Sequence, residues 1–306
     1  MSRRLRFIPE GGALVEVTCR ALHSRLLFCP RPLMNEIIIG TLARAKQRHK
    51  VRVCFFVCLG NHMHLLLWTE NARELSKFMG YFLSKLAREI GRLTRWKEKI
   101  FGRRYTSIVA SDEEEAQIAR LRYQLGHGAK EDLVDRPRDW PGVHCVRALL
   151  EGEALEGLWF DRTQEYLARR RGEKFELLQY ATREVLDLDP LPCWKHLTAV
   201  QRRVRVAALV EDIEAEVAAR RKRTGAKPLG VAAVLAQNPL QRPKKTKKSP
   251  APAFHAASKA VRRDLRDAYA LFVAAYRTAA EKLRAGIRDA VFPRGSFPPA
   301  LPFVDA

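Results

Sequence analysis

Two apolar runs of the chain, residues 51–59 and 62–68, are separated by only two residues, Gly60 and Asn61. A two-residue connection that contains glycine is typical of a tight β-turn, so the sequence predicts an antiparallel hairpin. Such a hairpin is stable only as part of a larger sheet that buries at least one of its faces. We therefore expect a β-sheet at the centre of the first half of the chain.

The segments on either side of this hairpin alternate between strand-like and helix-like patterns of apolar residues. In chain order we expect a strand at 14–19, a helix at 33–46, the two hairpin strands, a helix at 72–96, a strand at 103–110, and a helix opened by a capping box at 111–114. Strand, helix, strand, strand, helix, strand is the order of the split βαβ, or ferredoxin-like, fold. The predicted class is α+β: an antiparallel ferredoxin-like sheet followed by a mainly α-helical C-terminal region.

A chain of 306 residues is long enough for about two domains. After about residue 160 the sequence becomes rich in Ala, Arg and Leu, and two segments at 198–222 and 256–285 have helical periodicity. A basic stretch without acidic residues lies between these segments. The expected division is a domain at 1–150, a connecting segment at 151–190, and a helical region at 191–306 with a basic linker at about 239–252.

The chain carries a formal net charge of +22, with a sequence pI of about 10.2. Solubility needs far less charge, so we expect a polyanionic partner, and nucleic acid is the leading candidate. A membrane surface is the competing partner, but no uninterrupted apolar stretch approaches the length that spans a bilayer. The basic N-terminus is not followed by an apolar signal core, so we expect a cytoplasmic, nucleoid-associated protein with no membrane partner.

The second hairpin strand contains His62 and His64, with Met63 between them. Side chains of a strand alternate between its two faces, so both imidazoles are expected side by side on one face. Imidazole is a common ligand of metal ions, which makes the pair a candidate metal site. Strand histidines satisfied by backbone or water explain the same pair, because this spacing alone is weak evidence. The other histidines lack ligand-like companions and are expected in structural or surface positions: His23, His49, His144, His196 and His255.

The helix expected after residue 114 adds a further chemical group. Its apolar stripe runs through Leu121 and Leu125, whereas Arg120, Tyr123 and His127 fall on a different face. A helical tyrosine is most often a half-buried packing residue. A tyrosine that points away from the apolar stripe, one turn from a histidine, is a better candidate for a nucleophile.

Several separated motifs, in this order, resemble those of the single-tyrosine HUH transposases, and the similarity is greatest to the REP-associated tyrosine transposase branch. The motifs are Val17-Thr18-Cys19-Arg20, Gly60-Asn61-His62-Met63-His64-Leu65-Leu66-Leu67, Gly102-Arg103-Arg104-Tyr105, Arg122-Tyr123, Leu133-Val134, and Arg136-Pro137-Arg138-Asp139-Trp140-Pro141. The resemblance covers roughly residues 1–145, about half of the chain. The departures from the family pattern are Gly60, which stands where proline is usual, and the lack of an Asn-Pro sequence after the tyrosine.

The resemblance implies a specific chemistry. Members of this family hold a divalent metal with the two HUH histidines, here His62 and His64, and attack a phosphodiester of single-stranded DNA with a helix tyrosine, here Tyr123. The third ligand comes four residues after the tyrosine, where this chain has His127. The implied activity is that of a metal-dependent endonuclease and strand transferase that forms a 5′-phosphotyrosine at hairpin-bearing or palindromic DNA. Three nitrogen ligands favour Mn²⁺ or another first-row ion over Mg²⁺, which prefers oxygen.

The segment 85–104 is the candidate surface for single-stranded DNA. Such binding needs a basic groove with aromatic rings on which bases stack, and this stretch is rich in both. The expected phosphate contacts are Lys85, Arg88, Arg92, Arg95, Arg103 and Arg104. A basic helix face that is only solvated is the competing interpretation.

Alternatives of different classes remain at this stage. The chain is either an active transposase-like enzyme, a catalytically silent DNA-binding protein derived from a transposase, or a metallohydrolase that uses a metal-bound water and not the tyrosine. The region after residue 160 is expected to dock on the nuclease core, to hold flanking duplex, or to bring two protomers together as a homodimer.

Overall fold

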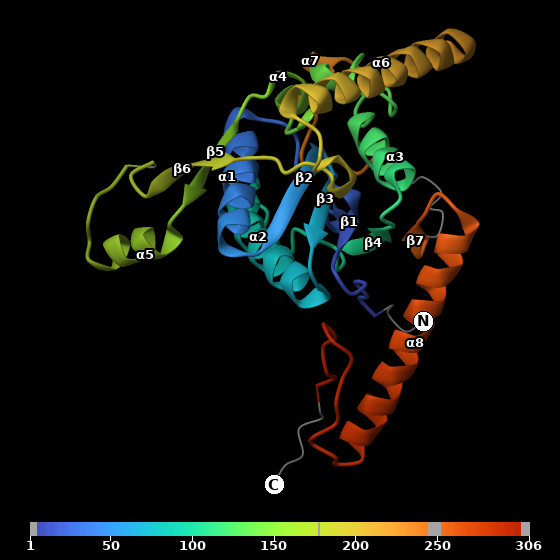
Figure 1. Ribbon diagram of the computed structural model, residues 1–306. Helices are drawn as coiled ribbons and strands as arrows, with labels where there is room; N and C mark the ends of the chain where they lie inside the picture. The colour runs from blue at the N-terminus through green and yellow to red at the C-terminus, as the bar shows by residue number, and fades with distance from the viewer. Residues whose placement is uncertain (1–4, 177, 244–251, 301–306) are drawn as a thin grey trace.

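The computed structural model of the chain describes residues 5–176, 178–243 and 252–300 (Figure 1). The fold is mixed α/β, with a five-stranded sheet at its centre and helices packed around it. The elements of the first half are β1 (Ala13–Arg20), α1 (Pro32–Arg48), β2 (Val51–Leu59), β3 (His62–Thr69), α2 (Ala72–Thr94), β4 (Thr106–Ala110) and α3 (Glu114–Leu125). The order of strands and helices expected from the sequence is thus present.

The second half of the chain adds helices, a small hairpin and one short strand. Its elements are α4 (Val146–Glu151), β5 (Leu155–Phe160), α5 (Arg162–Arg170), β6 (Ala181–Leu186), α6 (Ala199–Thr224), α7 (Val231–Leu235), β7 (Phe254–His255) and α8 (Lys259–Arg284). The basic residues Lys244, Lys245, Lys247 and Lys248 of the expected linker lie outside the described residues.

The strands of the large sheet follow the order β2-β3-β1-β4-β7. Neighbours among the first four are antiparallel, and the two-residue strand β7 is parallel to β4. The pairing of β1 with β3 places Thr18 opposite His64 and Arg20 opposite His62. This register determines which β1 side chains lie beside the two histidines.

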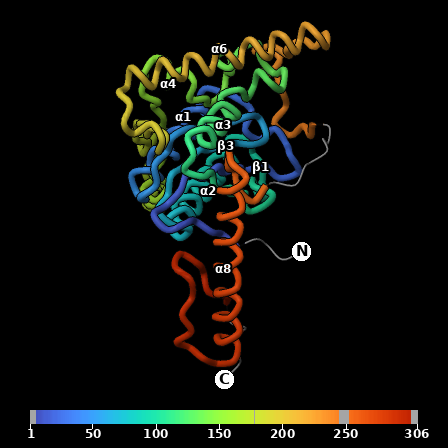
Figure 2. The backbone as a smooth tube through the Cα atoms, turned by 45° about the vertical axis from the view of Figure 1, so that its right-hand side comes forward, coloured from blue at the N-terminus to red at the C-terminus, as the bar shows by residue number. Residues whose placement is uncertain are grey.

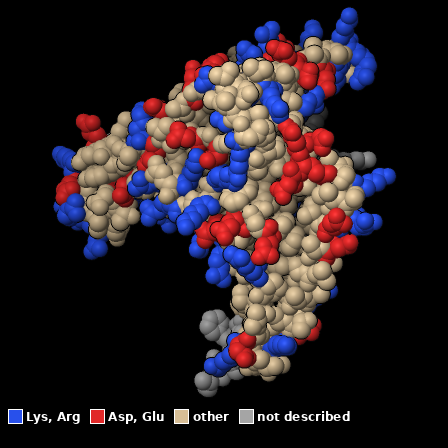
Figure 3. Space-filling model, viewed as in Figure 1, with Lys and Arg blue, Asp and Glu red and all other residues tan. Residues whose placement is uncertain are grey.

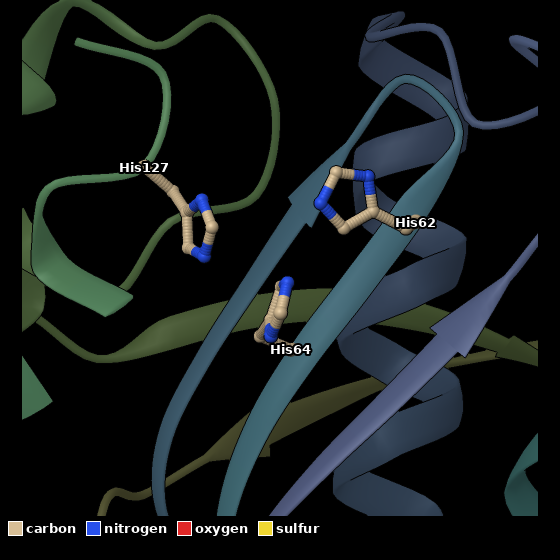
Figure 4. Close-up of side chains that lie close together, drawn as sticks. All are labelled: His62, His64 and His127. Atoms are coloured by element: carbon tan, nitrogen blue, oxygen red, sulfur yellow. The ribbon is translucent and has the colours of Figure 1, made fainter. Parts of the chain in front are cut away.

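Helices α1 and α2 pack on each other and on one face of the sheet. The stripe predicted on α2 is buried there, including Phe78, Phe82 and Ile90. His62 and His64 project from the opposite face, with α1 behind the strands (Figure 4). Helix α3 packs on β2, β3 and β4 and so lies over the face from which His62 and His64 project.

The hairpin of β5 and β6 packs against α1, and glycine permits its close approach. A Cβ atom at Gly157 would lie 2.2 Å from the carbonyl oxygen of Glu36, and one at Gly40 would lie 2.3 Å from the backbone of Leu158. These distances are too short for any side chain, so the helix and the strand are in direct backbone contact.

Helix α6 packs on α3 and α4, whereas α8 extends away from the sheet as a long arm (Figures 1 and 2). The arm is fixed to the first half by aromatic contacts of Phe7 with Phe254, Tyr269 and Phe272. The chain after α8 runs back beside the arm, where the Tyr276 hydroxyl donates a hydrogen bond to the carbonyl oxygen of Phe297. None of the helices in the described part of the chain is long and apolar enough to cross a membrane.

Two local expectations were wrong. The strand expected at 103–110 begins only at Thr106, so Arg103 and Arg104 lie in the loop before it. The capping box at 111–114 does not form, because α3 begins at Glu114 without a side-chain cap. The carboxylate of Glu113 instead accepts hydrogen bonds from the backbone N–H groups of Ala257 and Ser258, at the start of α8.

Candidate metal centre beside a helix tyrosine

Three imidazoles converge above the sheet: His62 and His64 from β3, and His127 from the turn that follows α3 (Figure 4). Their ligand atoms all lie within 4.8 Å of one another. The ring centroids of His64 and His127 are 4.4 Å apart, and that of His62 lies 5.0 Å from His64 and 5.9 Å from His127. This is a compact set of nitrogen donors of the kind that holds a divalent metal.

Each of these rings has an oxygen atom close to its Nδ1 atom. The pairs are His62 with the amide oxygen of Asn61 at 2.6 Å, His64 with the hydroxyl of Thr18 at 3.2 Å, and His127 with a carboxylate oxygen of Glu131 at 2.8 Å. Histidines that bind metal through Nε2 commonly donate the other N–H to such a partner, which fixes the ring and its tautomer. Each ring thus has an oxygen partner at Nδ1, which leaves Nε2 as the other ligand atom, and Nε2 of His127 also lies 3.4 Å from the Nζ atom of Lys130.

Burial lowers the pKa values of His62 and His127 well below the usual value for histidine, and their positive neighbours add to the shift. Both rings are therefore neutral at pH 7. Metal binding requires neutral imidazole, so no proton has to be displaced from these two rings.

Glu16 of β1 is a buried carboxylate beside this cluster, 5% exposed. Its oxygens lie 3.6 Å from Nδ1 of His64, 2.9 Å from Nε2 of His255 and 3.7 Å from Nη1 of Arg120. Burial raises the pKa of this carboxyl, but the contacts with His255 and His64 outweigh burial and hold the pKa well below its usual range. His255, which was expected in a structural or surface position, is brought against Glu16 by β7.

Tyr123 lies on the solvent side of α3, with 43% of its surface exposed, whereas Leu121 and Leu125 are buried. Its ring centroid is 5.1 Å from that of His127 and 6.1 Å from that of His64. Burial of part of the side chain raises the pKa of the phenol, and the carboxylates nearby raise it further. The tyrosine is thus protonated at neutral pH unless a cation stabilises its phenolate.

Two cationic side chains already lie over the ring of Tyr123. The Nζ atom of Lys130 is 3.3 Å from the ring centroid, and the guanidinium of Arg120 is 5.4 Å from it. Lys130 also donates a hydrogen bond of 2.7 Å to the backbone carbonyl of Tyr123, and its Nζ atom is 3.4 Å from Nε2 of His127. Burial lowers the pKa of this lysine to about 8, so its charge varies within the physiological range.

The loop that carries His127, Lys130 and Glu131 is fixed to helix α6 by Arg221, whose side chain is only 10% exposed. The guanidinium donates hydrogen bonds to the carboxylates of Asp132 and Asp135 and to backbone carbonyls of the loop, including that of Ala129 at 3.0 Å. The second half of the chain therefore helps to position the third histidine.

The structure brings together all the residues expected at the reaction centre, His62, His64, Tyr123 and His127. Of the expected DNA contacts, Lys85, Arg88 and Arg92 lie on α2 and Arg95 directly follows its end. They do not surround this centre, because α2 covers the other face of the sheet. One of them, Arg92, forms an ion pair of 3.3 Å with Glu165.

Arg103 and Arg104 are exposed and lie in the loop before β4. The neighbouring N–H of Gly102 donates a hydrogen bond to the carbonyl of Arg20, the residue that faces His62 in the sheet. On the face shown in Figure 3, Lys and Arg side chains are spread over several regions, with Asp and Glu between them.

Sequence reasoning did not identify Glu16, Lys130, Glu131 or Arg221 as parts of the site. Glu16 did give a signal, since a carboxylate inside an otherwise apolar strand is rarely buried without a partner. Glu131 lies four residues after His127, which is contact spacing on a helical turn. No local pattern in the sequence indicates the role of Arg221, because its partners lie about 90 residues earlier in the chain.

No protein-family model matches the chain, and a comparison with curated proteins finds no match. Among solved structures the chain is similar to a REP-associated tyrosine transposase bound to a REP hairpin, with 15% identity and a TM-score of 0.39 over 46% of this chain and 81% of that chain. It is also similar to a putative transposase from Deinococcus radiodurans R1, with 12% identity and a TM-score of 0.29 over 40% of this chain and 95% of that chain. These similarities are low and partial.

Proposed function

We propose that the chain is a metal-dependent, single-stranded DNA endonuclease and strand transferase that acts through a 5′-phosphotyrosine at Tyr123. The observation that carries this proposal is the convergence of three imidazoles within 4.8 Å, with the exposed tyrosine ring 5.1 Å from one of them. A metal site beside a nucleophilic oxygen is the arrangement that transesterification of a phosphodiester requires.

The finer features of the fold support the same proposal. The strand order β2-β3-β1-β4 with antiparallel neighbours, and two helices on one face, is the arrangement of a ferredoxin-like sheet. His62 and His64 on its central strand β3 would form the HUH motif, and the net charge of +22 favours DNA as the partner.

The donor set fits a divalent cation of the first transition row. Three imidazole nitrogen donors, each with an oxygen at its Nδ1 atom, suit Mn²⁺ better than Mg²⁺, which prefers oxygen ligands. When bound, such a cation supplies positive charge to the scissile phosphate and to a phenolate beside it.

Side chains of the protein supply the nucleophile and the charges that stabilise its attack. The Tyr123 oxygen attacks phosphorus, the bond between phosphorus and the 3′ oxygen breaks, and the phosphate remains on the tyrosine as a 5′-phosphotyrosine. The phenol proton is lost to solvent, and the departing 3′ oxygen gains a proton to become a hydroxyl. Lys130 and Arg120, next to the ring, stabilise the negative charge that develops during attack. Attack by a different 3′-hydroxyl reverses the sequence and joins two strands without ATP.

The test is incubation of the chain with hairpin-bearing single-stranded DNA and Mn²⁺, followed by denaturing electrophoresis. We expect a covalent protein–DNA adduct that is absent in Tyr123→Phe. Binding of DNA without any adduct would favour the silent DNA-binding protein, and cleavage that survives Tyr123→Phe would favour hydrolysis by a metal-bound water.

The identity of the metal provides a separate check. We expect Mn²⁺ to support adduct formation at least as well as Mg²⁺ at saturating concentration, because the donors are nitrogens. A clearly higher rate with Mg²⁺ would contradict a site made of three imidazoles. As a control, His62→Ala should lose activity with either ion while still binding DNA.

A further inference from the structure

A surface cavity lies beside the candidate centre, between α3 and the start of α8. Figure 2 shows α8 beginning directly below α3. The walls are held in place by β7, which pairs with β4, and by Glu113, whose carboxylate accepts the N–H groups of Ala257 and Ser258 at 2.8 and 2.9 Å. The hollow is therefore part of the folded structure rather than a gap between independent elements.

The volume of this cavity is about 500 Å³. Its floor is apolar, formed by Ala116 and Ala119 of α3 and by Phe254 and Ala256 of the β7 segment. Pockets for small ligands typically measure about 300 to 1,000 Å³ and combine apolar walls with a few polar groups. The cavity is thus large enough for one nucleotide, with a surface against which a base can pack.

Three arginines line the same cavity, Arg120 from α3 and Arg262 and Arg266 from α8, against a single carboxylate, that of Glu115. Arg262 donates one hydrogen bond of 2.8 Å to the carbonyl of Ala256. Within the described part of the chain, neither Arg262 nor Arg266 forms an ion pair with a carboxylate. Guanidinium groups with donors to spare are suited to phosphate, which they bind through two parallel hydrogen bonds.

Arg120 lines the cavity and also lies beside the candidate centre. Its guanidinium lies 5.4 Å from the ring centroid of Tyr123, and its Nη1 atom lies 3.7 Å from Glu16, which contacts His64. Arg120 therefore links the ring of Tyr123 to the lining of the cavity.

We propose that the cavity between α3 and α8 binds one nucleotide of the single strand, next to the scissile phosphate. Arg262 and Arg266 bind the phosphate of this nucleotide, and its base packs against Phe254 and Ala256. This assignment rests on the proposed function. It gives the C-terminal arm a role in substrate recognition, in a place different from the basic face of α2.

The experiment measures binding of a fluorescein-labelled oligo(dT) by anisotropy in EDTA, with Tyr123→Phe as the parent so that no cleavage occurs. The test variant is Arg262→Ala/Arg266→Ala, and the matched control is Arg263→Ala/Arg277→Ala. The control residues lie on the same helix, are exposed and do not line the cavity. Both variants remove two positive charges from α8.

We expect the cavity variant to bind at least tenfold more weakly than the parent and the control to change less than threefold. The slope of log affinity against log salt should decrease in magnitude by about 0.7 in the cavity variant, the value for one lost phosphate contact on a single strand. Because Arg262 also holds the turn at Ala256, Arg266→Ala alone serves as a second variant, and Arg266→Lys should restore part of the affinity.

A positional readout completes the test. Oligo(dT) that carries 5-iododeoxyuridine should photocrosslink to the peptide containing Phe254 and His255, and this crosslink should disappear in the cavity variant. Equal losses in the cavity and control variants, or crosslinks that never include this peptide, would overturn the proposal. Since no step needs metal or cleavage, failure to form a tyrosine adduct would count against the proposed function and leave this measurement intact.

Discussion

Replacement of Arg221 by methionine is the most informative single change outside the three-histidine cluster. The arginine joins α6 to the loop that carries His127, and it donates hydrogen bonds to two carboxylates and three backbone carbonyls. Methionine retains most of the length and apolar surface of the side chain but none of its donors. The variant therefore removes the polar link and changes little else.

The size of the effect follows from the burial of each partner. Asp135 is 68% exposed, so its ion pair contributes little. The carbonyls of Ala129 and Val134 lie in partly buried contacts, and each loses about 1 kcal/mol without its donor. Asp132 keeps Arg220 as a partner and loses about 1 kcal/mol more. We expect Arg221→Met to lower the local stability of the loop by about 3 kcal/mol.

Hydrogen exchange followed by mass spectrometry measures this directly. Amides at 128–135 should exchange on the order of 100 times faster in Arg221→Met, since 1.4 kcal/mol corresponds to a factor of ten. Mn²⁺ titration by electron paramagnetic resonance should show weaker binding. The matched control is Arg223→Met, which lies two residues further along α6 and is exposed. If both variants exchange at the same rate, Arg221 does not hold the loop and the reasoning is refuted.

Three further predictions follow from local geometry. Glu131→Gln should weaken Mn²⁺ binding roughly 10- to 100-fold in a titration, because the ring of His127 loses a charged partner; an unchanged affinity would exclude Glu131 from the site. Gly157→Ala should destabilise the fold by about 3 kcal/mol or more in guanidinium denaturation, because its Cβ would overlap the backbone of α1, whereas Gly80→Ala, with open space around it, should be neutral or stabilising. Burial lowers the pKa of His144 to about 4, so the folded state keeps this ring neutral while the unfolded state binds a proton below pH 6.5. Stability should therefore fall as the pH drops from 6.5 to 4, and His144→Gln should lack about 3 kcal/mol of that pH dependence; parallel pH curves for the two proteins would contradict this.

The parts of the structure that follow from local periodicity were predictable from the sequence. The two-residue turn fixed the hairpin, and strand alternation placed His62 and His64 on one face. Helical spacing placed Tyr123 away from the buried stripe of α3. Each of these depends only on neighbours within a few residues, so a single sequence contains the information.

The parts that were missed depend on partners far apart in the chain. Glu16 meets His255 only because β7 joins the sheet beside β4, and Arg221 meets the His127 loop only because α6 packs over α3. The predicted capping box failed for the same reason, since the carboxylate of Glu114, its expected acidic member, accepts hydrogen bonds from Trp194 and from Arg205 of α6. Local sequence rules cannot anticipate partners that lie 80 and 91 residues further along the chain.

The short strand β7 also has a consequence for the solution behaviour of the chain. It pairs with β4 at Val109 and Ala110, and so occupies backbone groups that would otherwise be open at one border of the sheet. Unpaired borders of this kind recruit strands from other molecules and promote aggregation. A protein shortened to end before residue 252 should therefore self-associate, even if its three-histidine cluster is intact.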